Sequence, residues 1–201
     1  MMARSLEVAL VVEDVLSLVV MEKVMAHTER GYTVVRTLVE RGVDNIRTSI
    51  LKYRNASHVL AHVVLADLDN APCAPSLRQQ WGVATLPDTM LFRVAVREVE
   101  AWVLADRAGF ASFAGIPQNK VSPSPETLAN PKQALINLVR QSRNRRLVSE
   151  LVPEQGTSMS KGPMYNERLG QFVRERWDVA AAMQAAPSLQ RTVGRLQHFL
   201  N

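Results

Sequence analysis

Two stretches of this sequence decide the fold: Val-Ala-Leu-Val-Val-Glu-Asp at residues 8–14 and His-Val-Val-Leu-Ala-Asp-Leu-Asp at residues 62–69. In each, a run of apolar residues stops at acidic residues. Consecutive apolar residues predict a strand that is buried on both faces, as in a parallel sheet. Ligands of open α/β sheets bind beyond the carboxyl ends of the strands. The two acidic ends therefore predict a site for a divalent metal ion.

The segments around these stretches alternate between strand and helix patterns. Residues 15–27 have apolar positions at helical spacing, and residues 32–39 are rich in β-branched residues. The expected strands are residues 7–12, 32–39, 59–66 and 90–96. The expected helices are residues 15–27, a segment ending near residue 54 with Asp44 as its N-cap, 76–81 and 98–105. This alternation predicts an α/β fold with a mostly parallel sheet of about four strands, flanked by helices.

The rest of the chain is expected to be helical. Four prolines make residues 117–131 loop-like, and the later regular segments all have helical patterns. These segments are residues 132–142, 145–151, 165–176 and 188–200. We therefore expect an α/β domain at residues 1–116 and an all-helical extension at residues 117–201, packed on that domain.

Composition narrows the class of protein. With 201 residues and 47% hydrophobic content, the chain is long enough to bury a core, but its apolar runs are too short to cross a bilayer. We expect no membrane association and a cytoplasmic location, because the first residues do not resemble a cleavable signal. Residues 1–131 hold 13 Lys/Arg against 14 Asp/Glu, whereas residues 132–201 hold 11 against 5. A basic C-terminal part beside an acidic site suits a polyanionic partner, and nucleic acid is the expected one.

The acidic residues have the chemistry of a phosphoryl-transfer site. Asp67 and Asp69 are expected on the same side of an extended backbone, where their oxygens can bind Mg²⁺ or Mn²⁺. Glu13, in the neighbouring turn, is expected to bind a metal ion or to transfer a proton, with a pKa raised by its acidic neighbours. The alternative is that each acid is simply a solvated strand end.

A glutamate after the first strand and Asp-X-Asp after the third resemble the pattern of the TOPRIM (topoisomerase-primase) family, over about residues 6–106. Similar segments are residues 98–106 (Glu-Val-Glu-Ala-Trp-Val-Leu-Ala-Asp), 130–132 (Asn-Pro-Lys) and 162–166 (Gly-Pro-Met-Tyr-Asn). The likeness extends to small TOPRIM-related bacterial proteins, some linked to nucleases of mobile elements and phage defence. It implies a Rossmann-like fold and a catalytic role for Glu13, Asp67, Asp69 and Glu100.

The resemblance also implies that Glu100 or Glu98 adds a carboxylate to the metal site. In a helix these two side chains are about 200° apart, so only one is expected to reach the metal. Two positions depart from the family pattern: Asp14 stands where a glycine is usual, and Leu18 where an acidic residue is frequent. Asp14 is bulky and anionic, which puts close approach of a phosphate at that turn in doubt.

The basic residues predict where nucleic acid would bind. Residues 140–146 hold four arginines in seven positions, and guanidinium groups match phosphate oxygens well. Lys161, in a polar loop, is expected to close over a phosphate. The expected nucleic-acid-binding residues are Arg140, Arg143, Arg145, Arg146 and Lys161. The alternative for the arginines is an exposed helix junction paired to Glu150 and Glu154.

The leading functional expectation is a Mg²⁺-dependent phosphodiester enzyme, a nuclease, with phage defence as one setting for it. One alternative is a phosphoacceptor receiver domain, since an acidic pair and a strand-end aspartate are typical of that class. Another is a non-catalytic subunit with a relic site, suggested by Asp14 and Leu18. A protein partner, for example an ATPase subunit, is also expected. The apolar spacing of the last helix is compatible with a homodimer.

Overall fold

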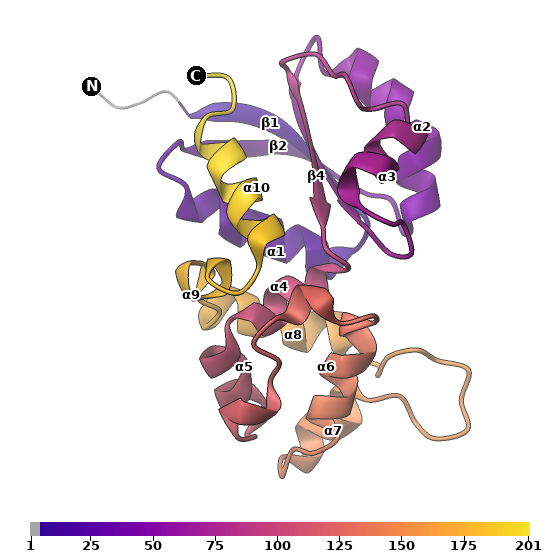
Figure 1. Ribbon diagram of the computed structural model, residues 1–201, viewed down its shortest axis with the longest axis vertical. Coiled ribbons are helices and arrows are strands. Elements are labelled where there is room, and N and C mark those ends of the chain that lie inside the picture. The colour runs from indigo at the N-terminus through magenta and orange to yellow at the C-terminus, as the bar shows by residue number, and fades with distance from the viewer. Residues whose placement is uncertain (1–4) are drawn as a thin grey trace.

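The computed structural model describes residues 5–201, and its centre is a four-stranded, all-parallel sheet. The chain alternates strand and helix as far as the fourth strand, and every later regular element is helical (Figure 1). The strands are β1 (Leu6–Val12), β2 (Tyr32–Val39), β3 (Ala61–Asp67) and β4 (Met90–Ala95). The helices between them are α1 (Val15–His27), α2 (Val43–Ala56) and α3 (Ala74–Gln80). The predicted α/β class with a parallel sheet of four strands is therefore confirmed.

The strands lie in the order β2-β1-β3-β4 and are all parallel. Successive strands are added first on one side of β1 and then on the other. The chain moves from β1 to one neighbour, β2, and then crosses back to the other neighbour, β3, so the connections diverge on either side of the β1–β3 pair. In doubly wound sheets this reversal opens a crevice beyond the carboxyl ends of the two strands, where ligands bind. Glu13 follows β1, and Asp67 ends β3. Both acids therefore stand at the switch point of the sheet.

Each face of the sheet is covered by helices, as the consecutive apolar residues predicted. Val8, Leu10 and Val12 belong to the larger hydrophobic cluster, with α1, α4 and the later helices. Val11 faces the other way, into a smaller cluster formed with α2 and α3. Strands buried on both faces need apolar residues at every position, which is why the runs in β1 and β3 do not alternate with polar residues.

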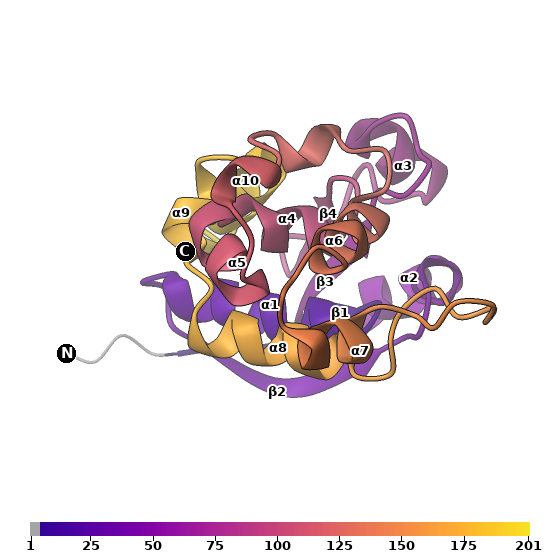
Figure 2. The same cartoon turned by 90° about the horizontal axis from the view of Figure 1, so that it is seen from below.

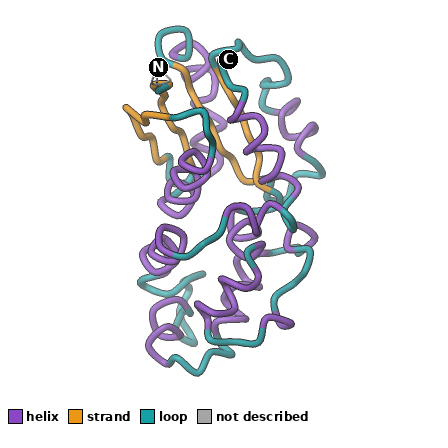
Figure 3. The backbone as a smooth tube through the Cα atoms, turned by 90° about the vertical axis from the view of Figure 1, so that its left-hand side faces the viewer, coloured by secondary structure: helices purple, strands orange, loops and turns teal. Residues whose placement is uncertain are grey.

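The helices after β4 gather below the carboxyl edge of the sheet (Figures 1 and 3). They begin with α4 (Val99–Ala105) and α5 (Arg107–Ala114), followed by α6 (Pro131–Val139), α7 (Arg145–Leu151), α8 (Tyr165–Glu175) and α9 (Val179–Met183). Two short 3-10 turns, η1 (Gln118–Lys120) and η2 (Pro125–Thr127), lie between α5 and α6. This confirms the predicted helical C-terminal part, and it places α6 and α8 beside the acidic strand ends.

The last helix, α10 (Pro187–Gln197), returns to the sheet and lies beside β4 and α1 (Figures 1 and 2). Ser188 accepts a hydrogen bond from the Val96 amide, and the Tyr32 hydroxyl donates to the Leu196 carbonyl. One hydrophobic cluster contains residues from β1, α4, α8 and α10. The helical part thus packs on the α/β part through a shared core, and the division at residues 116 and 117 stays a prediction.

Several details of the prediction were wrong. Asp44 is not the N-cap of α2, because the helix begins at Val43 after Gly42, which adopts a φ of 137°. The third strand begins at Ala61, whereas Val59 is 94% exposed in the preceding turn. The helices α5 and α9 were not predicted. Both carry an aspartate N-cap, Asp106 and Asp178, whose side chains accept from the amides of Gly109 and Ala181.

Within residues 5–201, no helix is both long and apolar enough to cross a lipid bilayer.

Candidate functional site

Acidic side chains from three segments meet at the carboxyl edge of the sheet. Asp67 is the last residue of β3 and is 6% exposed, and its Oδ1 accepts a hydrogen bond from the Val99 amide at 3.1 Å. Burial raises the pKa of Asp67 well above its ordinary value, and the charges of Glu100, Glu13 and Asp69 raise it further. Carboxylates influence each other in this way only when they lie close together. The predicted convergence of Glu13, Asp67, Asp69 and Glu100 therefore has a physical basis in the structure.

Asp69 reaches this cluster by a different backbone route from the one predicted. The strand ends at Asp67, and Asp69 lies in a turn with a φ of 47°, so the alternation of an extended chain does not apply to it. Asp and Asn tolerate this left-handed conformation better than most residues. The turn is held by the Asp69 amide, which donates to the Arg97 carbonyl, and by the Arg97 guanidinium, which donates to the Asp69 carbonyl at 2.8 Å. Burial and the charge of Glu98 raise the pKa of Asp69.

Glu98 and Glu100 both contact Lys132, and the prediction that only one of them reaches a metal ion stays a prediction. Glu98 is the N-cap of α4 and has an extended backbone, so the angle of about 200° between helical positions does not separate the two side chains. Each places its Oε1 3.6 Å from the Nζ of Lys132. Glu98 Oε2 also accepts from the Lys132 amide at 2.8 Å, at the start of α6. The two glutamates therefore form one anionic wall against α6.

Lys132 is a residue of this site that the sequence did not reveal. A cation in the first turn of a helix is disfavoured by the helix dipole, so its position needs compensation from anions. Burial acts to lower the pKa of Lys132, but Glu100, Glu98 and Asp67 outweigh it and raise the pKa above its ordinary value. The chain thus places its own cation among the acids. Asn130, which caps α6, and Pro131, which begins it, are the local signals that a helix starts here and orients this lysine.

Two carboxylate oxygens in the cluster are buried without any hydrogen-bond partner among the described residues. These atoms are Oε2 of Glu13 and Oε2 of Glu100. Glu100 is 1% exposed, and its other oxygen accepts from the Tyr165 hydroxyl at 3.1 Å. Burial, together with a smaller contribution from acidic neighbours, raises the pKa of both glutamates to about 7, although the charge of Lys132 opposes the shift. Unpaired buried oxygens of this kind are costly to a folded chain, and a proton, a water molecule or a cation would satisfy them.

Oxygen donors of this type match a hard divalent cation such as Mg²⁺, but in this structure they do not form a complete coordination site. Within residues 5–201, no three Asp, Glu, His or Cys side chains lie close enough together to hold a metal ion as they stand. Lys132 partly neutralises Glu98 and Glu100 instead. The donor set therefore fits the metal in its chemistry and in its unpaired oxygens. Binding would require the carboxylates to close around the ion.

Asp14 has a structural role at the start of α1. Its Oδ1 accepts from the Ser17 amide at 2.9 Å, which caps α1. Its Oδ2 lies 3.8 Å from the Nζ of Lys161, and this lysine also donates to Asn166. Lys161 therefore stands beside the acidic cluster and is paired to Asp14 and Asn166. Its predicted contact with a phosphate stays a prediction.

The four arginines lie farther from the acids. Arg140 follows α6 and is eight residues beyond Lys132, which is roughly 12 Å along a helix. Arg146 is paired to Glu150 at 2.9 Å, as the alternative interpretation proposed, whereas Arg140 donates to the side chain of Asn137. Arg143 and Arg145 are exposed and form no ion pair within residues 5–201. This leaves them available to an external anion.

Replacing Glu13 with glutamine is expected to stabilise the metal-free protein at pH 8. A pKa raised to about 7 means that the folded chain binds the proton more tightly than the unfolded chain. The stability from this group is therefore complete below the ordinary value of 4.5 and is lost as the pH rises through about 7. A glutamine side chain cannot ionise, and we expect a gain of about 2 kcal/mol at pH 8, discounted for partial exposure. Urea denaturation in a chelator at pH 5 and pH 8 measures this difference.

The matched control is Glu22→Gln, because Glu22 is an exposed residue of α1 without an ion pair in the described chain. It should leave the free energy of unfolding unchanged at both pH values. A Glu13→Gln protein that is no more stable than the wild type at pH 8 would show that the ionised Glu13 side chain is not destabilised by burial and by its acidic neighbours.

Comparisons with protein-family models, with curated proteins and with solved structures gave no match.

Proposed function

We propose that this chain is a TOPRIM-like, Mg²⁺-dependent phosphodiester enzyme that acts on nucleic acid as a nuclease. The observation that carries the proposal is that Glu13, Asp67, Asp69, Glu98 and Glu100 lie near enough to one another, at the carboxyl edge of a parallel sheet, to raise each other's pKa values. Their mutual repulsion, and the two unpaired buried oxygens of Glu13 and Glu100, are destabilising in the absence of a ligand. A divalent cation would relieve that repulsion and would pair with the two oxygens.

The proposed roles follow from the environment of each acid. Asp67 and Asp69 would hold the metal, with Glu13 and Glu100 completing the set, and the metal would supply charge stabilisation for a phosphoryl group. Glu13, with a pKa of about 7, is suited to accept or donate a proton near neutral pH. Lys132 offsets part of the negative charge of Glu98 and Glu100, and it is near enough to the acids to contact a phosphate oxygen.

The basic residues around this edge support a polyanionic substrate. Lys132 and Lys161 lie at the acids, and exposed Arg143 and Arg145 lie beyond the far end of α6. A phosphate chain could be held by these arginines and reach the acids along α6.

A non-catalytic binding module is the second candidate, and a specific observation favours it. Lys132 already occupies a cation position between Glu98 and Glu100, which is how a site that has lost its metal would keep its charges balanced. In that case the cluster would contribute only to the fold, and the chain would act through a protein partner. The two candidates differ in whether a divalent cation binds to the folded protein.

The proposed function predicts cleavage by the wild-type chain in Mg²⁺ or Mn²⁺ and none in excess chelator. The assay uses labelled single-stranded DNA, double-stranded DNA and RNA as separate substrates, so that the preferred class is read directly. Glu22→Gln is the control and should cleave at the wild-type rate, since its side chain is exposed and unpaired within the described chain. Cleavage that persists in chelator would contradict the proposal.

A further inference from the structure

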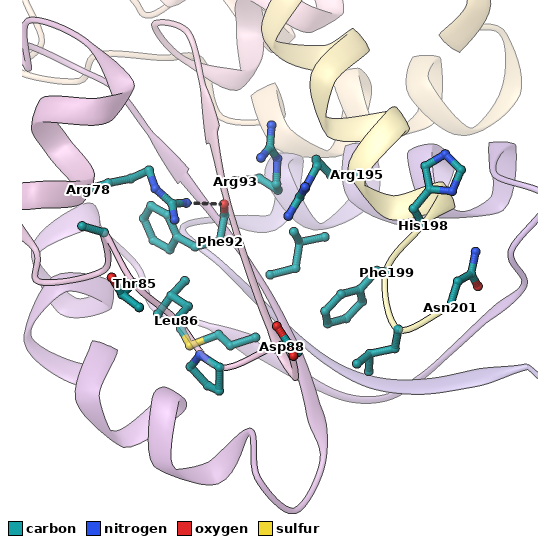
Figure 4. A pocket seen from close by; sticks show the side chains of 15 residues that line it. Arg78, Thr85, Leu86, Asp88, Phe92, Arg93, Arg195, His198, Phe199 and Asn201 are labelled. Atoms are coloured by element: carbon teal, nitrogen blue, oxygen red, sulfur yellow. Dashed lines mark hydrogen bonds between the residues drawn. The ribbon is translucent and has the colours of Figure 1, made fainter.

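A cavity of about 720 Å³ lies beside β4, between the turn that precedes this strand and the end of α10. Three arginines line it: Arg78 from α3, Arg93 from β4 and Arg195 from α10. Figure 4 shows Arg93 and Arg195 side by side, with Arg78 across the strand from them. Leu86 and Leu200 form the more accessible apolar parts of the wall, with the buried rings of Phe92 and Phe199 behind them.

The three guanidinium groups have few partners of their own. Arg78 donates to the Phe92 carbonyl at 3.0 Å and lies over the ring of Phe92. Arg93 donates to the Thr192 hydroxyl at 3.3 Å, which is a long hydrogen bond between a charged and a neutral group. None of the three forms an ion pair with a carboxylate in the part of the chain that the structure describes. Asp88 supplies an exposed carboxylate to the wall but pairs with none of them.

The setting of Arg93 is unfavourable in the absence of an anion. Burial, and to a lesser extent the neighbouring charges of Arg195, Arg78 and Arg191, lower the pKa of Arg93 to about 10. Partly buried arginines in proteins are usually matched by a carboxylate, because an unpaired charge out of water is costly. Here the nearest charges have the same sign. A cluster of guanidinium groups without a counter-ion is complementary to a multiply charged anion such as a phosphate group.

This cavity is separate from the acidic site. Residues 84–88 precede β4 and Met90 begins it, so the cavity opens toward the amino end of the strand. Asp67 pairs in the sheet with Ala95, at the other end of β4. The C-terminal residues that close the cavity contact Arg30, which lies before β2, through the Phe199 carbonyl. The cavity therefore lies toward the amino ends of the strands, and the acidic site lies at their carboxyl ends.

We propose that the cavity binds an organic phosphate of about nucleotide size, with the phosphate held by Arg93 and Arg195 and with Arg78 adding positive charge from across β4. Its volume lies within the range of about 300–1,000 Å³ that is usual for small-molecule sites and exceeds what a bare phosphate ion needs. Leu86 and Leu200 give the non-phosphate part of the ligand an apolar surface, and His198 adds a polar group at the opening. Ligand binding here is independent of the proposed nuclease site and holds whether or not that site is active.

Calorimetric titration of the full chain tests this, with adenosine monophosphate as the probe and inorganic phosphate as the comparison, at one fixed ionic strength. Arg195→Gln is the main variant, because Arg195 is exposed and its loss does not disturb the core. We expect binding of the mononucleotide to weaken by about tenfold in Arg195→Gln, and by more in the double variant with Arg93→Gln. Arg54→Gln, an exposed arginine of α2, should bind like the wild type, and so should Asp67→Asn at the acidic edge.

Three results would overturn the proposal. The first is no binding of the mononucleotide, or equal binding by the wild type and the arginine variants. The second is equal affinity for inorganic phosphate and the mononucleotide, which would remove the role of the apolar wall. The third is binding of a single-stranded oligonucleotide without binding of the mononucleotide, which would assign the arginines to a nucleic-acid surface.

Discussion

Asp67→Asn is expected to reduce Mg²⁺-dependent cleavage by about 10²–10³-fold, as losing a group that stabilises transition-state charge commonly does. Asp67 is the most central acid of the cluster, since its pKa is raised by burial and by the charges of Glu100, Glu13 and Asp69. Asparagine has nearly the same shape and keeps an oxygen that can accept from the Val99 amide. The fold should therefore persist, while one negative charge of the proposed metal site is lost.

The measurement is the rate of cleavage of the preferred substrate at saturating Mg²⁺, beside wild type and Glu22→Gln. Circular dichroism and the melting temperature of each protein show whether the fold is kept. In the absence of metal, Asp67→Asn should melt no lower than the wild type, because the variant relieves repulsion between buried carboxylates. A well-folded Asp67→Asn protein that cleaves at the wild-type rate would remove Asp67 from the site.

Trp102→Ala is expected to lower the free energy of unfolding by about 3–5 kcal/mol, the usual loss for a large aromatic residue in a core. Trp102 lies in α4 and is fully buried within the larger hydrophobic cluster. Its Nε1 donates to the Ser188 hydroxyl at 2.7 Å, and its carbonyl accepts from Trp177 Nε1 at 3.2 Å. It therefore joins α4 to α10 and to the segment before α9. Its removal should loosen the helical part and the sheet together.

Urea denaturation followed by tryptophan fluorescence and by circular dichroism measures this loss. The control is Val59→Ala, since Val59 is 94% exposed and its truncation should change stability by less than about 0.5 kcal/mol. Coincident transitions from the two signals are expected, because one core spans both parts of the chain. A loss below about 1 kcal/mol in Trp102→Ala would show that the helices are not held through this residue.

The sheet could be predicted because each strand is short, apolar and bounded by polar residues. Residues 32–39 matched β2, and the β1 and β4 boundaries differ by about one residue. The strand order could not be predicted, because the local sequence pattern does not specify which strands are adjacent in the sheet. The helices α5 and α9 were not predicted because they have only eight and five residues, which is too few to show a clear helical period of apolar residues. Their aspartate N-caps are the only local sequence signal for them.

The candidate site was only partly accessible to sequence reasoning. Acids at the ends of β1 and β3 must meet if the strands are adjacent and parallel, so Glu13 and Asp67 followed from the pattern. Lys132 did not, because it approaches from α6, which is far along the chain and is positioned only by tertiary packing. The side-chain directions of Asp69 and Glu98 were also not predicted correctly. They were inferred from ideal strand and helix geometry, and the backbones of both residues depart from it.

The proposed function depends on these carboxylates binding a divalent cation together. Chelator-treated, full-length protein can be titrated with Mn²⁺ and followed by electron paramagnetic resonance, with Mg²⁺ as competitor. We predict that the wild type and Glu22→Gln bind Mn²⁺, that Mg²⁺ displaces it, and that Asp67→Asn and Glu13→Gln each bind it at least about tenfold more weakly. Absence of binding in the wild type, or equal binding by all four proteins, would contradict the metal site.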